Sequence, residues 1–160
     1  MIMREICLKS DNVSGLSRII AIPVAVFNRL KRVGLAQIVS VADETSLVKV
    51  PIADDMSFVF DEQQRVEDGS NLYEITISGF IPRVDSSPDI LRVLERGEWL
   101  VFCSDNNGAH RLCGTKLVPM RFVSHRSTGG ASGMNCISFS FQCTQEMPTE
   151  IVDDSRFVIE

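Results

Sequence analysis

Apolar and polar side chains alternate along two segments of this chain, and this alternation limits the possible fold more than any other feature of the sequence. Residues 72–81 carry most of their large apolar side chains at odd-numbered positions, and residues 135–143 do the same. A period of two is that of a β-strand with one buried face. We therefore expect both segments to be strands that lie against an apolar core.

Shorter apolar segments between turn residues predict further strands. These are residues 19–26, 37–41, 47–52, 57–60, 110–114 and 120–124. Residues 99–103, Trp-Leu-Val-Phe-Cys, are apolar at every position, which is typical of a strand covered on both faces. The cover is either another part of the chain or a second subunit, so Trp99 and Val101 are candidate assembly residues.

One helix is expected at residues 88–96. Ser87 is a suitable N-cap, Pro88 fits the first turn, and Gly97 is a suitable end. The apolar side chains of this segment fall on one stripe, which we expect to lie across a sheet. A second helix is a candidate at residues 24–33, where it competes with a strand at residues 19–27.

These elements predict an α+β fold that is mostly β. We expect two packed antiparallel sheets, or a partly closed barrel, with one flanking helix. The 160 residues fit one domain. We assign residues 1–145 to a single β-rich domain. Residues 146–160, with five acidic residues and one arginine, are assigned to an acidic C-terminal tail or extension.

Two loops have a clear composition. Asn107-Gly108 predicts a two-residue hairpin turn, which would place Cys103 opposite Leu112 and Val101 opposite Gly114. Residues 127–133 contain three glycines, and we expect this loop to become ordered only on assembly. Gly129 and Gly130 are therefore candidate assembly residues.

Charge is unevenly distributed along the chain, whose net charge is −5. Residues 1–34 have a balance of +4 and residues 43–68 a balance of −6. Such blocks either pair within one chain or join copies head to tail, which makes Arg29 and Arg32 candidate assembly residues. The alternative is that the acidic segments are solvated loops. The excess of acidic residues opposes tight binding to nucleic acid.

Residue types used in catalysis and metal binding occur here without the spacing that those functions need. Cys103, His110 and Cys113 could supply three zinc ligands, but strand alternation points His110 and Cys113 to opposite faces. No cysteine opens a helix after a strand, and no serine stands in a GxSxG motif. We therefore expect no enzymatic activity, no cofactor and no bound metal. The five cysteines lack CxxC spacing, so we also expect no disulfide.

The longest apolar run, residues 19–27, has nine residues, whereas a membrane-spanning helix needs about 20. We therefore expect no association with a membrane.

The predicted elements of residues 87–143 follow one another in a characteristic order. They are the capped helix, the strand with Trp99, the Asn-Asn-Gly hairpin, residues 112–115, residues 117–122, the glycine-rich loop and residues 135–139. This order resembles small structural proteins encoded in the tail regions of phages and prophages of Bacteroides-type gut bacteria. Residues 14–21 are similar to the start of such proteins.

The resemblance implies a virion structural protein that assembles into a phage tail tube or neck ring. It further implies a β-sandwich or barrel with a flanking helix. The expected partners are further copies of the chain and other tail proteins, and the expected location is the host cytoplasm during assembly and then the virion. A ligand-binding or enzymatic bacterial β-sandwich is the alternative.

Overall fold

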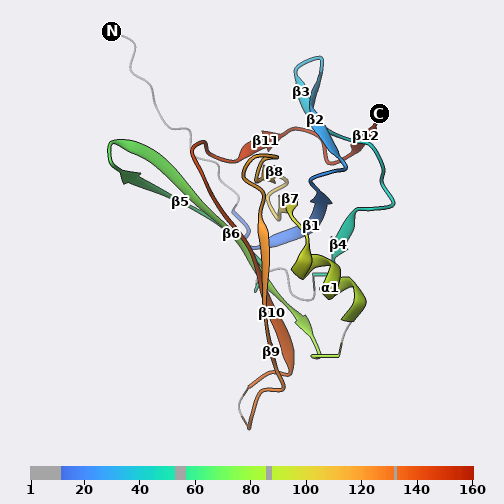
Figure 1. Cartoon of the computed structure of the whole chain (residues 1–160), viewed down its shortest axis with the longest axis vertical. Helices are drawn as coiled ribbons and strands as arrows, with labels where there is room; N and C mark the ends of the chain where they lie inside the picture. The colour runs from blue at the N-terminus through green and yellow to red at the C-terminus, as the bar shows by residue number, and fades with distance from the viewer. Residues whose placement is uncertain (1–11, 53–56, 86–87, 132) are drawn as a thin grey trace.

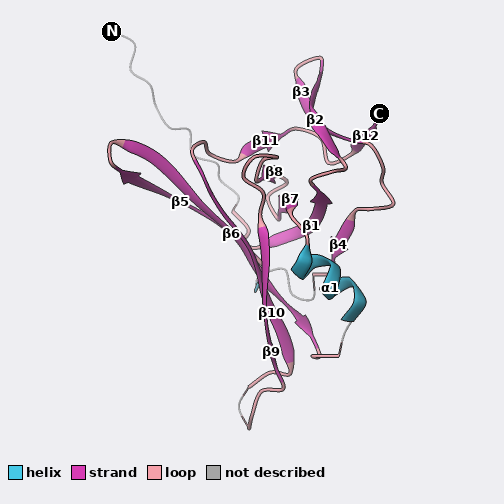
Figure 2. Cartoon of the chain, viewed as in Figure 1, coloured by secondary structure: helices cyan, strands magenta, loops and turns pink. Residues whose placement is uncertain are grey.

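The structure, a computed structural model, describes residues 12–52, 57–85, 88–131 and 133–160 (Figure 1). Strands dominate these residues, and one helix flanks them (Figure 2). The elements are β1 (Leu16–Pro23), β2 (Phe27–Val33), β3 (Ala36–Val41), β4 (Val48–Val50), β5 (Val59–Glu67), β6 (Ser70–Pro82), α1 (Pro88–Arg96), β7 (Trp99–Asp105), β8 (His110–Cys113), β9 (Arg121–Ser127), β10 (Cys136–Gln145), β11 (Glu150–Val152) and β12 (Phe157–Ile159). The expected fold class, mostly β with one flanking helix, is confirmed.

The strands form three sheets. A five-stranded sheet has the order β11-β8-β7-β1-β4, a four-stranded sheet the order β5-β6-β10-β9, and a three-stranded sheet the order β12-β3-β2. The pairing of β12 with β3 is parallel, and the other pairings are antiparallel. The chain therefore has one sheet more than expected, and its sheets stay open instead of closing into a barrel.

The five-stranded sheet is the middle layer of the molecule. On one side, Val101 and Cys103 belong to a core shared with the four-stranded sheet and α1. On the other side, Leu100 and Phe102 belong to a second core shared with the three-stranded sheet. Both faces of β7 are thus covered by the same chain, which explains why residues 99–103 are apolar throughout.

The alternation predicted for residues 72–81 and 135–143 is confirmed in β6 and β10. Ile75, Ile77, Ile137 and Phe141 are buried on the face toward the five-stranded sheet. β6 and β10 pair along ten positions, from Cys136 with Pro82 to Gln145 with Tyr73. Their buried face therefore forms the larger part of the first core.

Helix α1 begins at Pro88 and ends at Arg96, as expected. Leu91 and Leu94 are buried in the first core, whereas Ile90 and Val93 are half exposed, so the helix covers the sheet with a narrower stripe than its sequence suggests. The proposed cap, Ser87, lies outside the described residues.

Residues 24–33 do not form a helix. Residues 27–33 are strand β2, which pairs with β3 through a two-residue turn, Gly34-Leu35. Gly34 has a φ of 65°, a left-handed conformation that glycine adopts without strain. The tight turn and the pairing with β3 therefore favour a strand over a helix in this segment. Strand β1 ends at Pro23, before the expected end of the strand at residue 26 or 27.

The predicted register of the β7–β8 hairpin is wrong by one residue. Val101 lies opposite Cys113 and Cys103 opposite Arg111, because the loop has three residues, Asn106 to Gly108. The Asp105 carboxylate accepts hydrogen bonds from the backbone N–H groups of Asn107 and Ala109, at 2.9 and 3.0 Å. This side chain stabilises the longer loop.

Residues 146–160 are part of the packed structure. β11 pairs with β8 at one edge of the five-stranded sheet, and β12 pairs with β3 in the three-stranded sheet. Val152 is buried in the second core, and Phe157 packs against that core. The C-terminal segment therefore ties two sheets together instead of extending from the domain as a tail.

Replacing Gly79 by alanine is expected to lower the free energy of unfolding by about 1–3 kcal/mol, the usual cost of overpacking a core. A Cβ at this position would lie 2.4 Å from the ring of Phe58, which is fully buried. Urea unfolding measures the loss. Gly130→Ala is the control, since nothing lies within 4 Å of a Cβ there, and equal losses in the two variants would contradict the expectation.

Candidate assembly surfaces

Trp99 and Val101 lie in the core, with exposed fractions of 3% and 0%. The Trp99 indole N–H donates to the carbonyl oxygen of Leu94 at 3.0 Å, so the ring also holds the end of α1. A Cβ on Gly97 would lie 2.6 Å from this ring. Trp99 and Val101 therefore pack in the core of their own chain, and they are not on the surface available to another copy.

Gly129 and Gly130 lie in the loop that joins β9 to β10, at the lower end of the molecule in Figure 1. Gly129 has a φ of 78°, and its N–H donates to Ser127 Oγ at 3.0 Å. Residues 128–131 of this loop are exposed, so they are accessible to a second chain.

Arg29 and Arg32 lie on β2, and only the first of them has an ionic partner among the described residues. Glu160 binds Arg29 at 3.4 Å, binds Lys31, and accepts a hydrogen bond from the buried Ser40 hydroxyl at 3.1 Å. The hydrogen bond from Lys31, followed by that from Ser40, lowers the pKa of Glu160.

The basic segment thus pairs with the C-terminal segment. Among the described residues, no ion pair joins residues 12–34 to residues 43–68. The basic side chains of β2 therefore form no ion pair with the described acidic residues of the segment 43–68.

A long two-stranded ribbon, formed by the end of β5 and the start of β6, was not expected from the sequence. Every residue from 63 to 71 is exposed, so neither face of the ribbon is covered by the chain. It extends away from the sheets at the upper left of Figure 1. Its turn is Asp68-Gly69, with φ angles of 51° and 78°, as a type I′ turn requires.

The ribbon is held by contacts among residues of its own two strands, two of them between the strands and one within β5. The Arg65 guanidinium binds Glu74 at 2.8 Å and Glu67 at 3.2 Å. Gln64 Nε2 donates to Asn71 Oδ1 at 3.1 Å. These exposed polar contacts contribute little stability each, so a ribbon of this kind gains most from a partner outside the chain.

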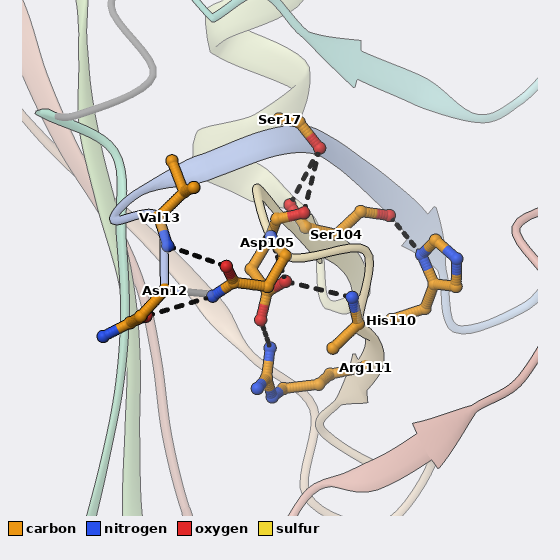
Figure 3. A network of polar contacts seen from close by, with 9 residues as sticks. Asn12, Val13, Ser17, Ser104, Asp105, His110 and Arg111 are labelled. Atoms are coloured by element: carbon orange, nitrogen blue, oxygen red, sulfur yellow. Dashed lines mark hydrogen bonds and ion pairs between the residues drawn. The ribbon is translucent and has the colours of Figure 1, made fainter. Parts of the chain in front are cut away.

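A polar network surrounds Asp105 at the β7–β8 hairpin (Figure 3). Besides its two backbone donors, Asp105 binds the Arg111 guanidinium at 2.9 Å. Asn107 Oδ1 accepts a hydrogen bond from the Val13 N–H at 2.7 Å, which ties the loop to the start of β1. Partial burial raises the pKa of Asp105, but the hydrogen bonds from Ala109, Arg111 and Asn107 outweigh it, so the net shift is downward.

Ser104 and His110 form the closest serine–histidine pair in this network. Ser104 Oγ lies 2.6 Å from His110 Nδ1, and the imidazole stacks on Phe102 with ring centroids 5.8 Å apart. A serine nucleophile has to meet its substrate, whereas Ser104 is only 4% exposed. The pair is placed to join β7 to β8 inside the fold.

Asp105→Ala is expected to lower the free energy of unfolding at pH 7 by about 1–3 kcal/mol, because it removes two hydrogen bonds to loop N–H groups and the ion pair with Arg111. The folded-state pKa of Asp105 lies below its ordinary value of 3.8. The stabilisation is therefore present above that value and is lost as the pH falls through the folded-state pKa. Urea unfolding from pH 7 to pH 3 measures the difference between the two proteins, and a difference that stays constant would contradict this assignment.

The described cysteines are buried or half-buried free thiols. Burial raises the pKa of Cys113 well above its ordinary value and raises the pKa of Cys143 to about 11, which keeps both thiols protonated. Cys113 faces the first core, whereas His110 lies beside Phe102 on the other side of the sheet. Within the described ranges, no three His, Cys, Asp or Glu side chains gather as metal ligands do.

The described part of the chain contains no helix with the length and apolar composition needed to cross a membrane.

The six candidate assembly residues fall into three separate places: the core, the glycine-rich loop and strand β2. No family model, no curated protein and no solved structure matches the chain.

Proposed function

We propose that this chain is a structural protein that assembles with copies of itself, as a component of a phage tail tube or neck ring. The observation that carries the proposal is the ribbon of residues 63–71, which is exposed on both faces and whose β5 edge pairs with no other strand of the described residues.

The isolated ribbon has low stability and an unpaired edge, and pairing with another copy would remove both disadvantages. A lone two-stranded ribbon is marginally stable in water, and a free edge strand offers unpaired N–H and C=O groups to other chains. Here Val66, on β5, is 68% exposed. Pairing of the ribbon with a different surface of the next copy is a heterologous contact, which repeats and closes into a ring where the rotation allows.

The assignment to a phage tail rests on the resemblance of residues 87–143, whose described part runs from α1 into β10. A genome neighbourhood with terminase, portal and tape-measure genes would support this part of the proposal. A neighbourhood of metabolic genes would favour the ligand-binding alternative.

Sedimentation velocity over a series from micromolar to millimolar concentration tests the assembly itself. We expect the chain to pass from monomer to one discrete ring-sized species or to tubes. Monomer at every concentration, also after other tail proteins are added, would refute the proposal.

Double-stranded DNA is expected to bind weakly, with a dissociation constant no tighter than roughly 10⁻⁴ M near 0.15 M salt, the weak end of non-specific binding. The chain has an excess of five acidic charges. Arg29 and Lys31 on the basic strand already bind Glu160. Fluorescence anisotropy with a random duplex measures the affinity, and submicromolar, salt-dependent binding that Arg32→Ala weakens would contradict it.

A further inference from the structure

We infer that the free edge of β2 receives the acidic ribbon of a neighbouring copy, an inference that rests on the proposed self-assembly. The ribbon edge and the β2 edge are both unpaired within the described chain, and they carry opposite charges. Together they form the two complementary halves of a head-to-tail contact.

The β2 edge has backbone groups available for a new strand. β2 is the last strand of its sheet, and its two-residue turn makes Val33 and Ala36 a hydrogen-bonded pair. Because such pairs alternate along antiparallel strands, the N–H and C=O groups of Leu30 and Arg32 point away from β3. No backbone hydrogen bond from another described segment reaches these groups.

The ribbon offers a matching edge. β5 is the last strand of the four-stranded sheet, and Glu67 pairs with Ser70 across the two-residue turn. The same alternation points the N–H and C=O groups of Gln64 and Val66 outward. An added strand is held by such main-chain hydrogen bonds, as in other cases of strand addition to a sheet edge.

Charge selects which edge meets the ribbon. The ribbon itself, residues 63–71, contains two acidic residues and one arginine, and Asp61, Glu62 and Glu74 lie just beyond its two ends. Strand β2 contains Arg29, Lys31 and Arg32, with Glu160 beside the first two. This leaves an acidic ribbon and a basic edge, so the two attract each other. Leu35, at the tip of the β2–β3 hairpin, is 98% exposed and offers an apolar contact.

The other free edge of the four-stranded sheet, β9, is a poorer match. Its Arg121 and Arg126 already bind Glu98 and Glu95 from the end of α1 and the residues after it. On β2, by contrast, Arg32 has no ionic partner among the described residues. The ribbon and the β2–β3 hairpin also extend from different sides of the molecule, the ribbon to the left and the hairpin to the upper right in Figure 1, as a contact between copies requires.

Charge reversal with exchange tests this contact. Arg32→Glu reverses the unpaired charge of the β2 edge. Asp61→Lys with Glu67→Lys reverses charges on β5 on either side of Gln64, so the test does not depend on strand direction. We expect each variant alone to need an at least about tenfold higher concentration for assembly, because like charges then face each other. An equimolar mixture of the two variants should recover assembly, because opposite charges meet again wherever the two variants alternate, and a ring with an even number of subunits can alternate throughout.

Matched controls carry the same charge changes elsewhere. Arg92→Glu on the exposed side of α1, and Glu44→Lys with Glu146→Lys, should leave assembly unchanged, and urea unfolding should confirm that all the variants fold. If the unmodified chain assembles and the reversed variants assemble equally well, the assignment of β2 is wrong and the proposed function stands. If the unmodified chain remains monomeric, the proposed function fails, and this contact fails with it.

Discussion

Replacing Trp99 by alanine is expected to lower the free energy of unfolding by about 3–5 kcal/mol, the cost of removing a large aromatic side chain from a packed core. The ring is 3% exposed, lies against Gly97, and donates its indole N–H to Leu94. Small domains are stable by only about 5–15 kcal/mol, so this variant loses a large part of its stability. Urea unfolding followed by far-UV circular dichroism measures the loss.

Trp99→Phe is the matched comparison, since it keeps an aromatic ring and removes the indole N–H. We expect this variant to fold, to lose less stability than Trp99→Ala, and to assemble normally. A Trp99→Ala variant of unchanged stability that no longer assembles would contradict the core role. That result would indicate that Trp99 lies at a contact between subunits.

Shortening the ribbon is expected to abolish assembly while leaving the monomer folded. Replacing residues 66–71 by Asp-Gly closes the ribbon between Arg65 and Leu72, which face each other in the present register. Tyr73 keeps its pairing with Gln145 of β10, so the four-stranded sheet retains its strands. Sedimentation velocity measures assembly, and urea unfolding measures the stability of the monomer.

Asp68→Asn is the control for this change, because asparagine also adopts the left-handed conformation that the turn needs. It retains the length of the ribbon and removes one charge, so we expect assembly at a concentration close to that of the unmodified chain. Normal assembly of the shortened chain would show that the ribbon is not the arm that joins the copies.

Long strands with one buried and one solvated face were predictable from the sequence. β6 and β10 have this environment, and their alternation is visible in the sequence. The bounds of α1 were also predictable, because proline and glycine mark its two ends. In these places, local sequence and tertiary environment favour the same structure.

The ribbon was missed because both of its faces are exposed. Residues 61–67 read Asp-Glu-Gln-Gln-Arg-Val-Glu and show no alternation, so the expected strand ended at residue 60, whereas β5 ends at Glu67. The signal that was present is Asp68-Gly69, a dipeptide typical of tight hairpin turns. This dipeptide predicts the hairpin, but it does not predict that both faces of the hairpin are exposed.

Other differences come from contacts between distant segments. β11 and β12 have three residues each, too few for a periodic pattern, and they exist because they dock on β8 and β3. Trp99 and Val101 were candidates for assembly because a strand that is apolar on both faces has to be buried on both faces. The sequence does not show whether the same chain or a second subunit buries it. The three-sheet arrangement supplies that cover from the same chain.

Negative-stain electron microscopy of the unmodified chain, concentrated until sedimentation velocity shows a single large species, tests the central claim of self-assembly most directly. We predict closed rings or stacked rings of uniform diameter, whose class averages show rotational symmetry. Fields of single small particles, or irregular aggregates without a repeating contact, would contradict it.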